Sequence, residues 1–160
     1  MKVRDSGMPE EANWNDFFNV DFLLSELNID SQITDLVEIG SGYGTFTIPA
    51  ARLIQGKLYA FDIEDEMIDI LNQKIQNKQI DNIRLEKRDI LAHSTALPDN
   101  SIDYVMLFNI LHHESPMEFI DEAYRILKSN GKIGIIHWRS DISTPRGPDL
   151  NIRPKPEQIT

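Results

Sequence analysis

The stretch LVEIGSGYGTF, residues 36–46, places three glycines at alternating positions directly after a short apolar run. Glycine has no Cβ atom, so the backbone can turn sharply and a bound molecule can approach it closely. A strand followed by a glycine loop and a helix also directs free backbone N–H groups toward a ligand. Gly40, Gly42 and Gly44 therefore predict a ligand-binding loop, although Gly44 alone would also suit close packing of helix on strand.

The residues around the loop argue against a bound phosphate. In the dinucleotide fingerprint G-x-G-x-x-G a third glycine follows two residues after the second, and here Thr45 stands in its place. No lysine follows the glycines, so the loop is not of the nucleotide-triphosphate type. Glu38 precedes the first glycine, where a carboxylate would repel phosphate and favour an ammonium or sulfonium group. The alternative for Glu38 is that it only orients the loop.

Acidic residues also follow the next two apolar runs. Asp62 ends the second run, where a carboxylate can accept hydrogen bonds from ribose hydroxyls. Asp89 follows the third run and is placed to accept from an exocyclic amine, with Ile63 and Ile90 available to sandwich a flat base. Capping of a following helix is the alternative for Asp62, and a solvated loop position is the alternative for Asp89. Together with Glu38 they describe a nucleoside with an amino-acid tail.

The pattern along the chain predicts an α/β fold. Short apolar runs at 36–40, 58–62, 83–88, 102–108 and 132–138 alternate with helical patterns. Such runs are typical of parallel strands covered on both faces. We therefore expect a Rossmann-like three-layer sandwich with a mainly parallel sheet. The predicted division is an N-terminal arm and helix (1–34), a Rossmann-like core that binds the cofactor (35–140) and a proline-rich extended arm (141–160).

Helix signals separate the predicted strands. Met67, Leu71 and Ile75 recur every four residues and predict a helix that runs to about residue 78. Ser115 and Pro116 are typical of an N-cap and a first helical residue, and the following helix should stop at KSNG, residues 128–131. Upstream, residues 14–27 predict one amphipathic helix packed before the first strand.

Five segments in order resemble the motifs of class I S-adenosylmethionine-dependent methyltransferases of the small-molecule "type 11" kind: VEIGSGYGTF, AFDIEDEMI, LEKRDI, IDYVMLFNILHH and EAYRILKSNGKIGII. The resemblance covers residues 36–138. It implies that the glycine loop, with Ser41, passes under the methionine part of the cofactor. It further implies that Asp62 holds the ribose, that Asp89 meets the adenine amine, and that Phe108 and Asn109 reach the amino group through backbone carbonyls.

The same resemblance implies a seven-stranded sheet whose last two strands form an antiparallel hairpin at the edge. The sequence ends before such a pair, so we expect a fold that is truncated before the last two strands. The fifth strand would then form an open edge, which favours association of two copies into a homodimer.

The candidates for acid–base chemistry are histidines. His112 and His113 follow the fourth predicted strand, and His137 ends the fifth, all at the edge where such sheets bind ligands. An imidazole titrates near neutrality, so any of the three can act as a general base. The alternative is that one histidine caps a helix and another packs in the wall. Trp138, with Trp14 or Phe17, would form an aromatic floor for a methyl acceptor.

Composition narrows the function further. The formal net charge is −10 and no basic stripe is present, so nucleic acid is not an expected partner. We expect no membrane span and no signal peptide, and with no cysteine there is no thiolate metal site. The expected protein is a cytoplasmic methyltransferase with a small-molecule acceptor and no metal. The alternatives are a non-catalytic cofactor-binding or interaction module and, third, an NAD-dependent oxidoreductase.

Overall fold

A single five-stranded sheet organises the fold in the computed structural model, which describes residues 10–144 and 147–159. The strand order is β3-β2-β1-β4-β5, and every neighbouring pair is parallel. The strands are β1 (Leu36–Ile39), β2 (Leu58–Asp62), β3 (Ile83–Lys87), β4 (Ile102–Phe108) and β5 (Leu127–Ile136). The predicted α/β fold with a parallel sheet is thereby confirmed, and all five predicted strands are present.

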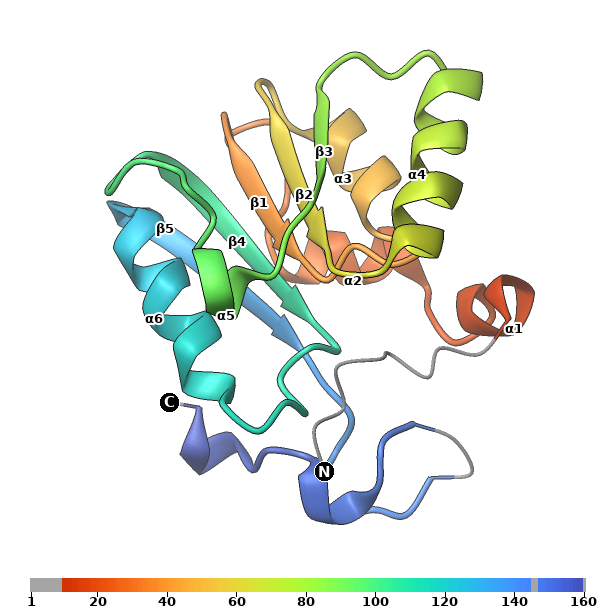
Figure 1. The fold of residues 1–160 in the computed structure, drawn as a ribbon, viewed down its shortest axis with the longest axis vertical. Coiled ribbons are helices and arrows are strands. Elements are labelled where there is room, and N and C mark those ends of the chain that lie inside the picture. Colours follow the sequence, from red (N-terminus) through yellow and green to blue (C-terminus); the bar gives the residue numbers. More distant parts are fainter. Residues whose placement is uncertain (1–9, 145–146, 160) are drawn as a thin grey trace.

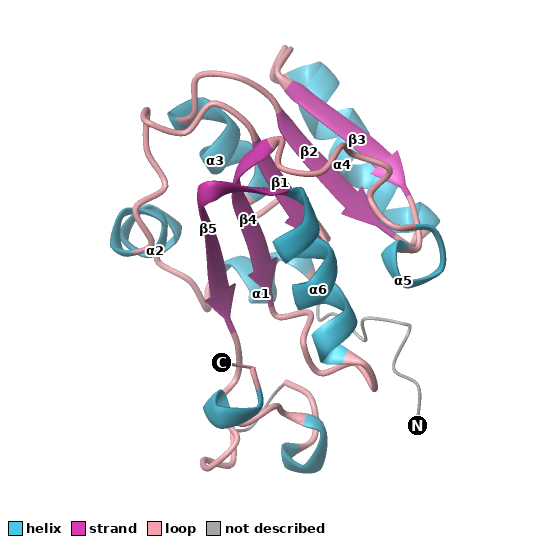
Figure 2. Ribbon diagram, turned by 90° about the vertical axis from the view of Figure 1, so that its left-hand side faces the viewer, coloured by secondary structure: helices cyan, strands magenta, loops and turns pink. Residues whose placement is uncertain are grey.

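Helices cover both faces of the sheet (Figures 1 and 2). One face carries α2 (Val20–Glu26), α3 (Thr47–Leu53) and α4 (Asp65–Asn77), and the other carries α5 (Ile90–His93) and α6 (Pro116–Ile126). A further short helix, α1 (Glu11–Asn15), precedes α2. The result is the three-layer arrangement expected from the sequence.

The alternation of side chains along each strand divides the core in two. Leu36 of β1 packs with the cluster under α2, α3 and α4, whereas its neighbour Val37 packs with the cluster under α5 and α6. Met106 and Leu107 of β4 divide in the same way. Successive side chains of a strand point to opposite faces of the sheet. A sheet covered by helices on both faces therefore needs apolar residues at odd and even positions of each strand.

The strand order creates a crevice at one edge of the sheet. The chain runs from β1 outward through β2 to β3 and then returns to place β4 on the other side of β1. The loops after β1 and β4 therefore leave the sheet in opposite directions, and ligands of open α/β sheets bind at this point, beside the carboxyl ends of the strands. The described part of the C-terminal arm lies beyond the same ends of β4 and β5 (Figure 1).

Two predictions about the helices are wrong. Residues 14–27 do not form one helix: α1 ends at Asn15, and Asn19 starts α2 by accepting a 3.2 Å hydrogen bond from Phe22 N–H. The helix before the last strand ends at Ile126 rather than at KSNG, because β5 begins at once with Leu127 opposite Ile102 of β4. In both cases the side-chain pattern continues through a point at which the backbone conformation changes.

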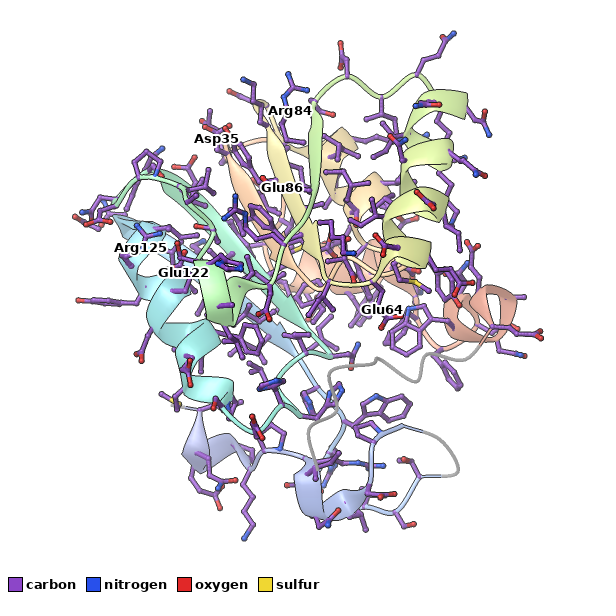
Figure 3. The ribbon with its side chains drawn as sticks, in the orientation of Figure 1. Asp35, Glu64, Arg84, Glu86, Glu122 and Arg125 are labelled. Carbon is purple, nitrogen blue, oxygen red and sulfur yellow. The ribbon has the colours of Figure 1, made fainter. Side chains whose placement is uncertain are left out.

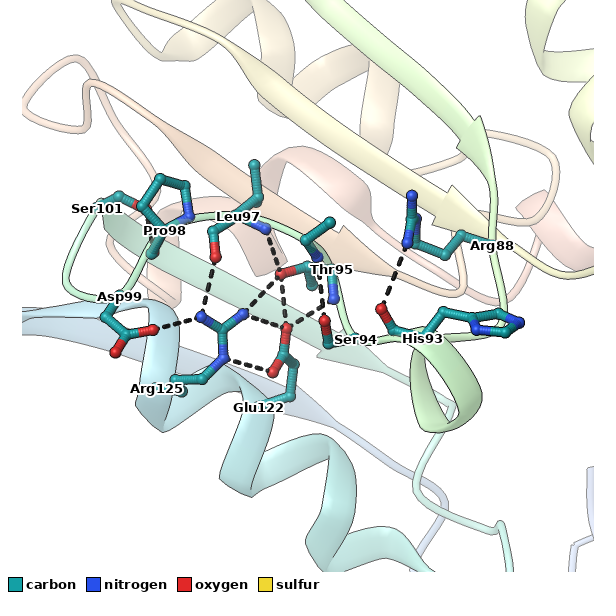
Figure 4. A network of polar contacts seen from close by, with 11 residues as sticks. Arg88, His93, Ser94, Thr95, Leu97, Pro98, Asp99, Ser101, Glu122 and Arg125 are labelled. Carbon is teal, nitrogen blue, oxygen red and sulfur yellow. Dashed lines mark hydrogen bonds and ion pairs between the residues drawn. The ribbon is translucent and has the colours of Figure 1, made fainter.

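A polar network fixes α6 to the loop after α5. Figure 3 shows Glu122 and Arg125 on α6 directed toward this loop. The Glu122 carboxylate accepts from the N–H and hydroxyl groups of Thr95, and Arg125 donates to Glu122, to the Leu97 carbonyl and to Asp99 (Figure 4). The Arg125 guanidinium and the two Thr95 donors lower the pKa of Glu122 despite its partial burial. The network is remote from the crevice, so we assign it to stability.

The arm after β5 is not extended throughout. It contains two 3₁₀ turns, Leu150–Ile152 and Pro156–Gln158, although the prolines predicted an extended chain. Residues 1–9 of the predicted N-terminal arm lie outside the described residues, and the division at residues 34 and 140 stays a prediction. None of the helices in the described ranges is long and apolar enough to span a membrane.

Candidate functional site

A cavity of about 550 Å³ lies at the carboxyl ends of the strands. It is lined by residues that follow all five strands, by Trp14 and Phe17 near the N-terminus, and by Gly147, Pro148, Asp149 and Ile152 of the C-terminal arm. This volume is within the range of sites for small organic molecules and cofactors. The cavity therefore occupies the crevice that the strand order predicts.

The three glycines of the loop have different surroundings. Gly40 and Gly42 line the cavity and have positive φ angles of 81° and 51°. Gly44 also has a positive φ, 79°, but it does not line the cavity. A Cβ atom on Gly44 would stand 2.4 Å from Leu71 Cδ1 of α4. Close packing of helix on loop therefore accounts for Gly44, and a ligand contact at this glycine stays a prediction.

Asp62, at the end of β2, ties the glycine loop to the start of α4. Its carboxylate accepts hydrogen bonds from three backbone N–H groups: Gly42 at 2.7 Å, Ile63 at 2.8 Å and Glu64 at 3.0 Å. A carboxylate has about four lone-pair sites, so one remains for a further donor from the cavity. Burial raises the pKa of Asp62, and the three N–H groups oppose that rise by stabilising the anion.

Glu38 lies at the bottom of the cavity and is almost fully buried. Its carboxyl group accepts a hydrogen bond from the Thr47 hydroxyl at the start of α3. Burial raises the pKa of Glu38 to about 8, and the negative charge of Asp62 adds to this rise. At neutral pH the group is therefore mostly protonated unless a cation enters the cavity.

Asp89 caps the helix that follows β3, and Ile90 forms part of the apolar wall of the cavity. Asp89 accepts hydrogen bonds from Leu91 N–H (3.1 Å) and Ala92 N–H (3.2 Å) at the start of α5, and it also lines the cavity. Ile63 and Ile90 line the same cavity from the ends of β2 and β3. Asp89 is therefore a helix cap rather than the solvated loop residue of the alternative, and its place in the lining leaves the ligand-binding prediction open.

Three buried polar atoms of the lining residues lack a hydrogen-bond partner within the described residues: Ser41 Oγ, Asn109 Nδ2 and His112 Nδ1. Asn109 follows Phe108 at the end of β4, has a φ of 54°, and donates its backbone N–H to Ile136 O at 2.7 Å. An unsatisfied buried polar group costs free energy, and native proteins rarely keep one without a reason. A ligand that offers hydrogen-bonding groups to this end of the cavity would supply the missing partners.

The three histidines occupy different positions. His113 Nδ1 accepts from Ser115 N–H at 3.2 Å and so helps to start α6, as the capping alternative expected. His112 and His113 both line the cavity, whereas His137 does not; the ring centroids of His112 and His137 are 5.7 Å apart. Burial lowers the pKa of His112 to about 4 and also lowers that of His137. Both imidazoles are therefore neutral at pH 7.

The contacts of Lys74 at the site had no clear signal in the sequence. Lys74 of α4 donates to the Tyr43 carbonyl of the glycine loop (2.7 Å) and pairs with Glu11 of α1, which holds α1 close to the loop and Trp14 at the cavity. The C-terminal arm contributes one wall of the cavity. Among the residues that the structure describes, no group of three or more His, Asp or Glu side chains is arranged to hold a metal ion.

Comparisons with known proteins agree with this geometry. The methyltransferase domain family matches residues 37–135. A methyltransferase-like protein of Schizosaccharomyces pombe is 30% identical over 130 residues, covering 81% of this chain and 46% of its own length. A demethylmenaquinone methyltransferase of Geobacillus is 28% identical over 100 residues, covering 61% of this chain and 42% of its own. This chain thus spans about half the length of the curated relatives it matches.

Solved structures match in fold. The crystal structure of an S-adenosylmethionine-dependent methyltransferase from Aquifex aeolicus superimposes with a TM-score of 0.79 at 21% identity, covering 94% of this chain and 79% of that one. At this identity the likeness speaks for the fold alone. The family match and this fold together place the chain among the class I S-adenosylmethionine-dependent methyltransferases. The chain belongs to the methyltransferase domain family.

Proposed function

We propose that this chain binds S-adenosylmethionine in the cavity beside the glycine loop and transfers its methyl group to a small-molecule acceptor. The observation that carries the proposal is the pair of unpartnered buried atoms, Ser41 Oγ and Asn109 Nδ2, in a cavity whose Asp62 carboxylate has one lone-pair site left. A molecule with hydroxyl, amine and carboxylate groups matches these needs. A pyrophosphate does not, because the Asp62 carboxylate in the lining would repel it.

The nucleoside half of the cofactor belongs at the β2 and β3 side of the cavity. Asp62 would accept one ribose hydroxyl through its remaining lone pair while it keeps the loop in place through Gly42. Asp89 would accept from the adenine amine, and Ile63 and Ile90 would flank the base. These roles follow the resemblance residue by residue, and the common lining of the cavity supports them.

The amino-acid tail belongs between the glycine loop and the end of β4. Glu38 would pair with its ammonium group, and Ser41, Phe108 and Asn109 would contact the tail. The bound cofactor supplies an electrophilic methyl group on a sulfonium. The protein's contribution is mostly alignment of the acceptor with that methyl group, a proximity effect that can lower the barrier by about 7–11 kcal/mol at best.

A proton acceptor is needed only where the methyl acceptor must lose a proton. His112 lines the cavity, is neutral at pH 7, and its Nδ1 atom has no partner among the described residues. It is therefore our first candidate for this role. His137, whose ring lies next to that of His112, would be the second candidate for this role. His113 is a weaker candidate, because its Nδ1 already accepts the Ser115 N–H at the start of α6.

A calorimetric titration tests the cofactor assignment. The chain is titrated with S-adenosylhomocysteine and, separately, with NAD; we expect binding of the first only. Equal binding of NAD would revive the oxidoreductase alternative. Transfer of a labelled methyl group to members of a metabolite panel then separates an enzyme from a non-catalytic binding module. Relatives named demethylmenaquinone methyltransferase support a small acceptor, and quinols belong in that panel.

The sheet edge gives a separate proposal about assembly. β5 is an edge strand of the sheet in the described chain. Exposed strand edges favour pairing with a second copy, so we propose a homodimer through β5. Light scattering after size-exclusion chromatography measures this directly, and a monomer at high concentration would contradict the proposal.

A further inference from the structure

The C-terminal arm folds back to form one wall of the cavity. Gly147, Pro148, Asp149 and Ile152 of the arm line it, together with Trp138 at the end of β5. The wall is packed closely: a Cβ atom on Gly147 would stand 2.8 Å from the Trp138 ring. The glycine loop and the ends of β2 and β3 line other parts of the same cavity, and these are the parts assigned to the cofactor.

A single buried side chain, that of Arg153, holds this wall together. It is 6% exposed and does not itself line the cavity. Its guanidinium donates four hydrogen bonds to the arm, to Pro148 O (2.7 Å), Arg139 O (3.0 Å), Ile142 O (3.1 Å) and Thr144 Oγ1 (2.7 Å). It also lies 5.8 Å from the centre of the Trp138 ring.

The partners of Arg153 are unusual for a buried charge. No carboxylate of the described residues lies within ion-pair distance of its guanidinium, so backbone carbonyls and one hydroxyl take the place of a counter-ion. Burying an unpaired charge is costly unless its donors are satisfied. The planar fork of an arginine can reach several acceptors at once, which the ammonium of lysine cannot match. Arg153 therefore ties two described parts of the arm together, the part from Arg139 to Thr144 and the part at Pro148.

The lining near this wall indicates what the cavity accepts. The rings of Trp14, Phe17 and Trp138 line it, and Phe17 meets Trp138 edge to face at 5.9 Å. Rings of this kind stack well on flat molecules. His112 adds an imidazole nitrogen with no partner in the described structure, which suits a hydroxyl group.

Charge narrows the class of acceptor. Asp149 is the charged residue that the arm contributes to the lining. Within the described residues the lining contains no lysine and one arginine, Arg88, which follows β3 and pairs with Glu86 at 2.7 Å. An anionic acceptor would therefore meet the Asp149 carboxylate, whereas the Arg153 guanidinium near Trp138 does not line the cavity and has its donors engaged by the arm.

We propose that Arg153 is a positioning residue that folds the arm into the wall of a methyl-acceptor subsite for a flat, uncharged, hydroxyl-bearing ring. The inference rests on the proposed function, because the remainder of the cavity is assigned to the cofactor. Arg153 acts through the arm and touches neither ligand.

The test uses 2-naphthol as the probe, titrated calorimetrically into the chain saturated with S-adenosylhomocysteine. Arg153→Met removes the fork and keeps a long apolar stem; we expect 2-naphthol affinity to fall at least tenfold and S-adenosylhomocysteine affinity to change less than twofold. Arg139→Met is the matched control, because the Arg139 side chain is exposed and pairs only with Asp141 among the described residues. Its two affinities should stay unchanged.

A second variant covers the case in which Arg153→Met does not fold. Ile152→Trp leaves Arg153 intact and fills the cavity from the arm, so it should abolish 2-naphthol binding alone. The anion 2-naphthoate should bind the unmodified chain at least tenfold more weakly than 2-naphthol. The proposal is overturned by equal naphthoate binding, by unchanged 2-naphthol affinity in Ile152→Trp, or by parallel loss of both ligands in a folded Arg153→Met. Failure of S-adenosylhomocysteine itself to bind would instead refute the proposed function.

Discussion

The Gly42 backbone N–H donates a 2.7 Å hydrogen bond to the Asp62 carboxylate, which joins the loop after β1 to the end of β2. One carboxylate therefore has two tasks: it shapes the glycine loop and keeps one lone pair for a ligand. Ribose binding is compatible with the bonds that Asp62 makes to Gly42, Ile63 and Glu64, because a carboxylate has enough lone pairs for both.

Asp62→Ala should weaken S-adenosylhomocysteine binding by about 10- to 100-fold. A hydrogen bond to a charged group contributes about 1.5–3 kcal/mol, and each 1.4 kcal/mol is a factor of ten in affinity. Calorimetric titration measures the change. Asp62→Asn is the informative companion, because its amide keeps one acceptor oxygen but cannot accept from Gly42 with the other atom; an intermediate affinity is expected. An unchanged dissociation constant in the alanine variant would refute the ribose assignment.

Glu38→Gln should change the pH dependence of stability. The folded-state pKa of Glu38 is about 8, above its ordinary value of 4.5, so folding favours the protonated form. Its contribution is full below pH 4.5 and is lost as pH rises to 8, with a slope approaching about 1.4 kcal/mol per pH unit. The glutamine variant cannot ionise, so this slope should be absent. Urea denaturation from pH 5 to 8 gives the comparison, and parallel curves for the two proteins would contradict it.

The same carboxyl group should couple ligand binding to proton release. At pH 7 Glu38 is mostly protonated, and an ammonium group entering the cavity would favour its anion. Binding of S-adenosylhomocysteine should therefore release protons, seen as a binding enthalpy that differs between phosphate and Tris buffers. Glu38→Gln should remove most of that difference. A buffer effect of the same size in both proteins would place the ammonium group away from Glu38.

Much of the site was predictable because it lies where strands end. Asp62 and Asp89 follow apolar runs, and parallel strands bring such positions to one edge whatever the loops do. The break between α1 and α2 was not predictable, because residues 14–27 keep an apolar pattern through it and only the cap at Asn19 marks the change.

The contacts of Arg153 were not predictable for a different reason. Arginine is usually exposed, and its burial depends on carbonyls of Arg139, Ile142 and Pro148 that converge only in the folded arm. A sequence pattern carries no information about such convergence. The prolines of the arm predicted an extended chain and gave no indication of the 3₁₀ turn at Leu150–Ile152 that places Ile152 at the cavity.

Gly44→Ala should destabilise the fold, whereas Gly40→Ala should mainly weaken the binding of S-adenosylhomocysteine. A Cβ atom at Gly44 would clash with Leu71 Cδ1 at 2.4 Å, and overpacking of this kind costs about 1–3 kcal/mol. At Gly40 the nearest side-chain atom, Ile110 Cδ1, is 3.1 Å away and the added methyl group would lie beside the cavity. Both glycines have positive φ, so that strain is common to the pair. Denaturation and titration of both variants measure the contrast, and a larger loss of stability in Gly40→Ala would contradict it.

His112 should stay neutral at pH values well below those at which an ordinary histidine becomes protonated. Burial lowers its pKa to about 4, and the neighbouring imidazoles of His137 and His113 add to this effect. The folded state then binds fewer protons than the unfolded chain between pH 4 and 6.5, so this group's contribution to stability is lost as pH falls through that range. In an NMR titration the His112 ring protons should show a midpoint near pH 4. His137→Gln removes one neighbouring imidazole and should move that midpoint upward. A midpoint near 6.5 in the unmodified chain would mean that His112 is open to solvent, and the case for it as a neutral proton acceptor in the cavity would be lost.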